Sequence, residues 1–286
     1  MTGTVLRHWP AMLDIALAER QGITRLTRNV HSGPLRVLKP FYPEGSCCHI
    51  YLLHPPGGLV LGDELTIHVH AQMNSHVLLT TPSAGKIYGV KSAQEQQTQR
   101  VNITVDANAT VEWLPQETLV FNGANAALHT QINLQANAQL IMWDVVCLGR
   151  PASHLWFEQG ECLQAIRIER DGIPLFIERN FIEGGKTLQR SEWGLNGAHS
   201  MGTFIATTKT SREQRMVFIE QLTQRFEVAK GNRAHRWGIT QKEDLLITRY
   251  LGDSAVLCRQ GFELLWRQLR PLMLNKTATA PRIWAT

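Results

Sequence analysis

One stretch of the chain decides the fold: Ile103-Thr-Val-Asp-Ala-Asn-Ala-Thr-Val-Glu-Trp-Leu-Pro115. Related stretches precede and follow it, at Val69-His-Ala-Gln-Met-Asn-Ser-His-Val-Leu-Leu-Thr-Thr-Pro82 and Ile132-Asn-Leu-Gln-Ala-Asn-Ala-Gln-Leu-Ile-Met-Trp-Asp144. Each copy alternates apolar and polar residues on both sides of an asparagine, which predicts a strand, a turn and a second strand. Asparagine suits the turn because it tolerates a left-handed backbone.

The spacing of the copies predicts how they pack. The turn residues Asn74, Asn108 and Asn137 lie 34 and 29 residues apart. Copies at this spacing suit stacked rungs, because each rung covers the apolar face of its neighbour. A sandwich of similar hairpins fits the same pattern, so the repeat alone leaves both architectures open.

The last third of the chain has a different pattern. Ser211-Arg-Glu-Gln214 resembles a capping box, and apolar residues follow at helical spacing, so we expect a helix over about 211–229 that ends at Gly231 and Asn232. We expect a strand over Leu245–Leu251. A second helix is predicted to start after Asp253 or Ser254 and to run to Arg270, stopped by Pro271.

These patterns predict a mainly β protein. A strand-rich body occupies residues 1–205, built like a β-helix or solenoid of stacked strands. The C-terminal part, residues 206–286, supplies two helices and a strand and packs on the body as one domain.

Composition restricts the class of protein. The 286 residues carry 29 Lys and Arg against 24 Asp and Glu, a net charge of +5 that does not by itself imply nucleic acid. The five cysteines form no C-x-x-C pair, which indicates reduced thiols and a cytoplasmic protein. Neither a secretory signal nor a run of about 18 apolar residues is present. We therefore expect a soluble protein that binds neither nucleic acid nor membrane.

Motifs for common chemistries are missing. Gly185-Lys186-Thr187 ends like a phosphate-binding loop, but Asn180 stands where that motif requires glycine, so nucleotide hydrolysis is not expected. The sequence contains no G-x-S-x-G, and nucleophilic catalysis gains little support.

Several acidic residues stand among apolar ones, as Asp144 and Glu178 do, where an unpaired charge is expensive. Pairing with arginine or lysine is one explanation. Two others are a polar passage for a transition metal, in which imidazoles and thiolates also serve, and the paired carboxylates of a glycoside hydrolase. The candidate side chains are Asp63, Glu64, Asp144, Glu178, His54, His68 and either Cys47 or Cys48.

Blocks in the same order resemble one known family, the UreD urease accessory proteins, called UreH in some organisms. The blocks run from Gly33-Pro34 to the C-terminus. The clearest are Leu52-Leu-His-Pro-Pro-Gly-Gly-Leu-Val-Leu-Gly-Asp-Glu-Leu65, Leu79-Thr-Thr-Pro-Ser-Ala-Gly-Lys-Ile-Tyr88, Val111-Glu-Trp-Leu-Pro-Gln-Glu-Thr-Leu-Val-Phe-Asn-Gly-Ala124, Trp143-Asp-Val-Val-Cys-Leu-Gly-Arg-Pro151, Arg170-Asp-Gly-Ile-Pro-Leu175 and Pro281-Arg-Ile-Trp284.

The resemblance implies a scaffold and not an enzyme. Members of the family are expected to bind the urease apoprotein and the accessory protein UreF, which recruits the GTPase UreG. Nickel would pass through the protein during GTP-dependent insertion, without a tightly bound cofactor. The resemblance also implies a β-helix-like body.

On this basis we predict a transient nickel passage lined by Asp63, Glu64, Asp144 and Glu178, with His54, His68 and Cys48 as further ligands. The apolar stripes of the two C-terminal helices are candidates for the UreF contact, represented by Phe226 and Trp266. The alternative is a β-solenoid carbohydrate hydrolase that uses two of the acids.

Overall fold

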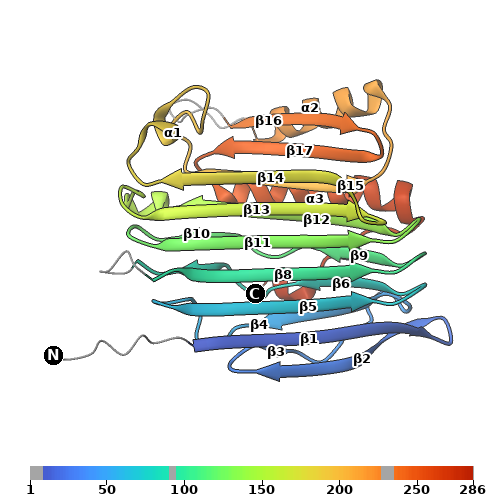
Figure 1. Ribbon diagram of the computed structural model, residues 1–286. Helices are drawn as coiled ribbons and strands as arrows, with labels where there is room; N and C mark the ends of the chain where they lie inside the picture. The colour runs from blue at the N-terminus through green and yellow to red at the C-terminus, as the bar shows by residue number, and fades with distance from the viewer. Residues whose placement is uncertain (1–8, 90–94, 227–234, 286) are drawn as a thin grey trace.

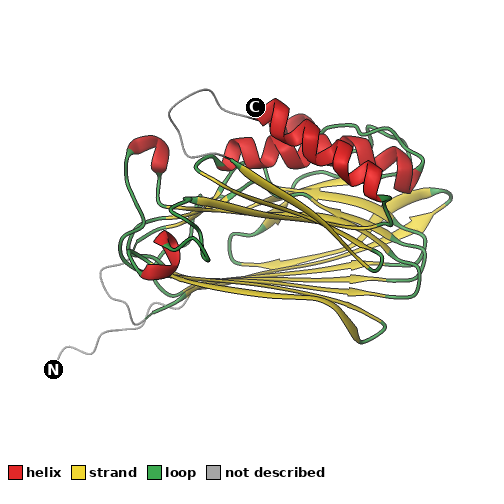
Figure 2. Cartoon of the chain, turned by 90° about the horizontal axis from the view of Figure 1, so that it is seen from above, coloured by secondary structure: helices red, strands yellow, loops and turns green. Residues whose placement is uncertain are grey.

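The computed structural model describes residues 9–89, 95–226 and 235–285 (Figure 1). Two β-sheets lie face to face, and helices cover the outer face of the second sheet (Figure 2). The first sheet has the strand order β14-β13-β11-β8-β5-β1-β2. Its strands are β1 Trp9–Arg20, β2 Ile23–Ser32, β5 Asp63–Ala71, β8 Gln97–Val105, β11 Asn125–Leu134, β13 Glu161–Arg170 and β14 Ile173–Glu183.

The second sheet follows the order β16-β17-β15-β12-β9-β6-β4-β3, with β7 and β10 attached beside β12. Its strands are β3 Arg36–Val37, β4 Cys48–Leu53, β6 His76–Thr80, β7 Gly85–Ile87, β9 Thr110–Trp113, β10 Thr118–Val120, β12 Gln139–Leu148, β15 Ser200–Thr207, β16 Arg236–Lys242 and β17 Leu245–Gly252. The helices are α1 Thr187–Arg190, α2 Arg212–Phe226 and α3 Ala255–Leu274, with short 3-10 turns at Pro151–Ser153 and Arg282–Ala285.

The expectation of a mainly β fold is confirmed, and the repeat explains its core. Each copy places its first strand in the first sheet and its second strand in the second sheet. Successive copies then pair in parallel: β5 pairs with β8 and β8 with β11, while β6 pairs with β9 and β9 with β12. The hairpin alternative is wrong, because the two strands of one copy do not pair with each other.

In two of the three copies, the asparagine between the two strands takes the left-handed conformation that the sequence predicts for the turn. Asn74 and Asn108 adopt the left-handed conformation, with φ of 62° and 59°. In the third copy Ala136 takes it instead, with φ of 43°. The Asn137 side chain is thereby free to accept a hydrogen bond from the Asn108 backbone N–H at 2.9 Å, which links neighbouring turns.

Alternation along the strands places the core between the sheets. In β5, Leu65, Ile67 and Val69 point inward and are buried, whereas His68 is exposed on the outer face. A second apolar cluster lies on the other face of the second sheet, under α3, and includes Trp143, Phe262 and Trp266.

The C-terminal elements confirm most of the prediction. Ser211 and Gln214 form the capping box: the Gln214 N–H donates to the Ser211 Oγ at 3.1 Å, and the Ser211 N–H to the Gln214 Oε1 at 2.8 Å. Residues 227–229 of the expected helix, with Gly231 and Asn232, lie outside the described residues. Ser254 caps α3 as expected.

The predicted end of the second helix at Pro271 is wrong. The helix α3 continues to Leu274 and ends at Asn275, whose φ is 52°. Leu269 and Arg270 are fully buried just before the proline, and this packing outweighs the backbone hydrogen bond that Pro271 cannot donate. The strand β16 was not predicted.

The second sheet runs through both predicted parts of the chain. The strand β15 pairs with β12 on one side and with β17 on the other, and residue 205 lies inside β15. Within the part of the chain that the structure describes, none of the helices has the length and hydropathy needed to cross a membrane.

Candidate functional site

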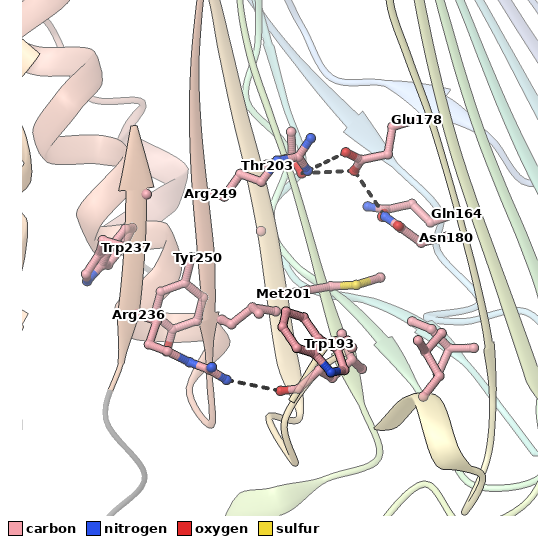
Figure 3. Close-up of a pocket in the computed structure, with 17 residues that line it drawn as sticks. Gln164, Glu178, Asn180, Trp193, Met201, Thr203, Arg236, Trp237, Arg249 and Tyr250 are labelled. Atoms are coloured by element: carbon pink, nitrogen blue, oxygen red, sulfur yellow. Dashed lines mark hydrogen bonds and ion pairs between the residues drawn. The ribbon is translucent and has the colours of Figure 1, made fainter. Parts of the chain in front are cut away.

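A cavity of about 390 Å³ lies between the sheets, near the edge formed by β14 and β16 (Figure 3). Most of its lining is apolar, and we call it the polar cavity after the polar side chains of one wall. Strand register explains its polar wall. In the second sheet Asp144 of β12 stands opposite Thr203 of β15, which stands opposite Arg249 of β17. In the first sheet Gln164 of β13 stands opposite Asn180 of β14. Polar side chains therefore interrupt the apolar interior on both sheets at the same level.

Glu178 is the centre of the polar cavity. Its side chain is only 9% exposed and forms an ion pair with Arg249, which reaches towards solvent (Figure 3). The Asn180 amide donates to the Glu178 Oε1 at 3.0 Å, and the Thr203 hydroxyl donates to the same oxygen at 3.3 Å. The Asn180 amide also donates to the Gln164 Oε1 at 2.9 Å. One acid is thus held by a cation and by neutral donors from both sheets.

Asp144 lies beside this group. Burial raises its pKa to about 6, a hydrogen bond with Gln164 opposes the rise, and the negative charge of Glu178 adds to it. The two acids therefore act on each other directly through their charges. The structure brings together Asp144 and Glu178, the two acids that the sequence places among apolar residues.

The other predicted acids lie elsewhere. The Asp63 carboxylate accepts the Val60 N–H at 2.8 Å and stabilises the turn before β5. Glu64 pairs with Arg100 at 3.3 Å on the outer face of the first sheet, where His68 is also exposed. In the first sheet β5 is four strands away from β14, roughly 19 Å at the usual strand spacing. These three side chains do not join the polar cavity.

His54 lines a separate, mainly apolar cavity of about 290 Å³ near the start of β5. Burial lowers its pKa, and the charge of Asp63 opposes this shift, so the imidazole and this carboxylate are electrostatic neighbours. Cys48 is buried in β4, with its Sγ 3.7 Å from the Tyr42 hydroxyl. Burial raises the pKa of the Cys48 thiol to about 11, so it is protonated at neutral pH.

The two side chains proposed for the UreF contact are buried in the chain itself. Phe226 is 6% exposed and Trp266 is fully buried. The Trp266 indole donates to the Glu112 Oε2 at 2.5 Å. A partner could therefore reach only other residues of these helices, such as Met216 of α2 or Leu272 of α3, which are exposed.

Sequence reasoning missed the groups that surround Glu178, namely Gln164, Asn180, Thr203 and Arg249. The alternation along β13 and β14 could have indicated them, because the other inward positions of these strands are apolar, as at Ile166, Phe176 and Ile182. Polar residues at inward positions mark a place where the interior must satisfy hydrogen bonds.

These features define a class, a strand-rich protein of two stacked sheets with a polar cavity between them. The chain belongs to the UreD urease accessory protein family, whose family model matches residues 10–285. Curated UreD proteins cover almost the whole chain. The protein of Saccharophagus degradans is 48% identical over 98% of this chain and 94% of its own length. The proteins of Pseudoalteromonas translucida and Chromohalobacter salexigens are 41% and 39% identical over 98% of this chain and 92% and 90% of their own lengths.

Membership of this family gives the chain the role of a urease accessory protein. The alternative of a carbohydrate hydrolase gains no support from these matches.

Proposed function

We propose that this protein is a cytoplasmic, non-catalytic scaffold of urease maturation. It binds the urease apoprotein and UreF, and through UreF it meets the GTPase UreG. The family supports an accessory role. The stacked parallel strands, which we interpret as a β-helix-like body, suit a scaffold because they form a rigid frame with extended faces.

We further propose that nickel passes through the polar cavity. The observation that carries this proposal is a set of oxygen-bearing side chains: Gln164 and Glu178 line the cavity, and the buried Asp144 of the opposite sheet interacts with both. Carboxylate and amide oxygens bind divalent cations, and transit requires that each site also releases the ion. The exposed Arg249 neutralises Glu178 and can swing into solvent when a cation takes its place.

The test is co-expression of the urease genes with and without this chain. The proposal predicts that urease made with the chain contains nickel and that urease made without it contains much less. It also predicts that the urease apoprotein and UreF co-purify with the tagged chain. Equal nickel in both ureases, or a chain that captures neither protein, would refute the scaffold role.

A further inference from the structure

A second group of ionisable side chains lies away from the polar cavity, on the outer face of the second sheet under α3. We call it the arginine cluster, and its members are Glu44, Cys47, His49, His76, Glu112 and Arg270. They come from the loop before β4, from the strands β4, β6 and β9, and from α3. Residues far apart in the sequence therefore meet at one buried point.

Arg270 is the central cation of the arginine cluster. Its Nε lies 3.0 Å from the Glu112 Oε2, and its Nη2 lies 2.6 Å from the Glu44 Oε2. Each acid also contacts a histidine, Glu112 at 2.7 Å from the His76 Nε2 and Glu44 at 2.8 Å from the His49 Nε2. The guanidinium thus lies between two carboxylates, each of which also contacts a histidine ring.

The remaining side chains have the composition of a metal site. Glu44, Cys47 and His49 have ligand atoms within 4.8 Å of one another, and so do Cys47, His76 and Glu112, so the two triads share one sulfur. Sulfur, imidazole and carboxylate together suit borderline divalent cations such as nickel and zinc. The His49 Nδ1 is buried and has no hydrogen-bond partner within the described part of the chain, although buried polar atoms are normally satisfied.

Charge supports the same conclusion. Two carboxylates face one guanidinium in an interior where Glu112, His49 and Arg270 are fully buried. The two carboxylates outnumber the guanidinium, and the other positive charges that act on the cluster come from His76 and from Lys276, whose Nζ donates to the Ser46 Oγ at 2.8 Å. Solvent reaches the group only at its margins, through the His76 and Glu44 side chains, which are 13% and 8% exposed.

We propose that Glu44, Cys47, His49, His76 and Glu112 form a site for a borderline divalent cation, and that Arg270 occupies the cation position when no metal is bound. The exchange conserves charge: the divalent ion enters, the guanidinium leaves, and Cys47 releases its thiol proton to water at the margin of the cluster and becomes a thiolate ligand. The proposal deepens the nickel role proposed above and rests on it only for the identity of the cargo.

The position of Arg270 makes the exchange feasible. It lies next to Pro271 in the last turns of α3, and its Nη1 donates to the Thr277 carbonyl just beyond the helix. Because Pro271 has no N–H, the helix lacks one backbone hydrogen bond at this point. The guanidinium therefore lies close to the C-terminal end of α3, where Asn275 caps the helix.

The test uses Co²⁺ as a spectroscopic probe and Ni²⁺ in equilibrium dialysis, both with the purified full chain. A thiolate-to-cobalt charge-transfer band is expected on binding. Cys47→Ser abolishes the band and weakens Ni²⁺ binding at least about tenfold, the loss that even outer-shell partners can cause. Cys147→Ser is the matched control, since its thiol is also buried but lies 3.9 Å from the Gly149 carbonyl, and it keeps both the band and the affinity.

A second variant protects the test against unfolding. His76→Gln changes a partly exposed member of the cluster and lowers the affinity by a similar factor, with circular dichroism as the check on folding. The proposal is overturned if Co²⁺ gives no thiolate band, or if folded Cys47→Ser and His76→Gln bind Ni²⁺ like the wild type. The cluster is then a structural ion pair only.

Urease activation by the same variants separates the two proposals. A Cys47→Ser chain that loses metal binding and still matures urease supports the metal site and refutes its use in nickel delivery. Unchanged metal binding in this variant refutes the site, whatever happens to urease.

Discussion

Glu112 connects the second sheet to α3 through hydrogen bonds and an ion pair. It is fully buried, and its carboxylate accepts hydrogen bonds from Trp266 and Arg270 of α3 and from His76 of β6. Glu112→Gln keeps the shape and removes the charge. Breaking a buried ion pair in this way costs about 3–5 kcal/mol, because among the described residues Arg270 then keeps Glu44 alone as an anionic partner.

The pKa of Glu112 reflects the same contacts with His76 and Arg270. Burial alone would raise this pKa, but the hydrogen bond and charge of His76, together with Arg270, lower it from 4.5 to about 2. At about 1.4 kcal/mol per pH unit, the difference is worth about 3 kcal/mol. Because the folded-state pKa is the lower one, this stabilisation is complete above pH 4.5 and is lost as the pH falls towards 2.

Urea denaturation of the wild type and of Glu112→Gln measures the difference in unfolding free energy. We expect about 3 kcal/mol or more at pH 7, and a smaller difference at pH 4 and below. The matched control is Glu64→Gln, which breaks the partly exposed pair with Arg100 and should cost no more than about 1 kcal/mol. Equal stabilities of Glu112→Gln and the wild type at pH 7 would refute the account of α3.

Two further predictions concern the interior and the turns. Asp144→Asn stabilises the chain at pH 7 by roughly 1–3 kcal/mol. The pKa of this acid is raised from 3.8 to about 6 in the folded chain, so its ionisation above pH 3.8 opposes folding. An unchanged urea midpoint at pH 7 would contradict this. Asn108→Ala destabilises by about 1–2 kcal/mol through its left-handed backbone, whereas Asn108→Gly does not. Equal midpoints for the Asn108 pair would show that the turn is not strained.

The local part of the fold could be predicted from the sequence because it is carried by neighbouring residues. The alternation around Asn74 and Asn108 gives the strands and turns of the repeat, and Ser211 and Ser254 mark the starts of α2 and α3. The strand β16 was missed because it is an edge strand in which Trp237 and Ile239 are the only half-buried apolar side chains.

The candidate site was less predictable because it depends on distances across the fold. Asp144 and Glu178 could be selected because apolar residues flank them in the sequence. They lie close together because β12 and β14 belong to sheets that face each other, and the sequence of one strand does not show which residues of the other sheet it faces. Arg270 stands four residues after Trp266 and continues the buried stripe of α3. An arginine in the apolar stripe of α3 and a glutamate in the otherwise uncharged strand β9 are the two features of the sequence that could have indicated the arginine cluster.

The most direct test of the passage is the nickel content of urease matured with Glu178→Gln, compared with the wild-type chain and with Glu64→Gln. The three chains should capture equal amounts of the urease apoprotein and UreF, because Glu178 lies inside the polar cavity and not on a surface. We predict several-fold less nickel in urease from Glu178→Gln and normal nickel from Glu64→Gln. Normal nickel from Glu178→Gln would contradict a passage through the polar cavity.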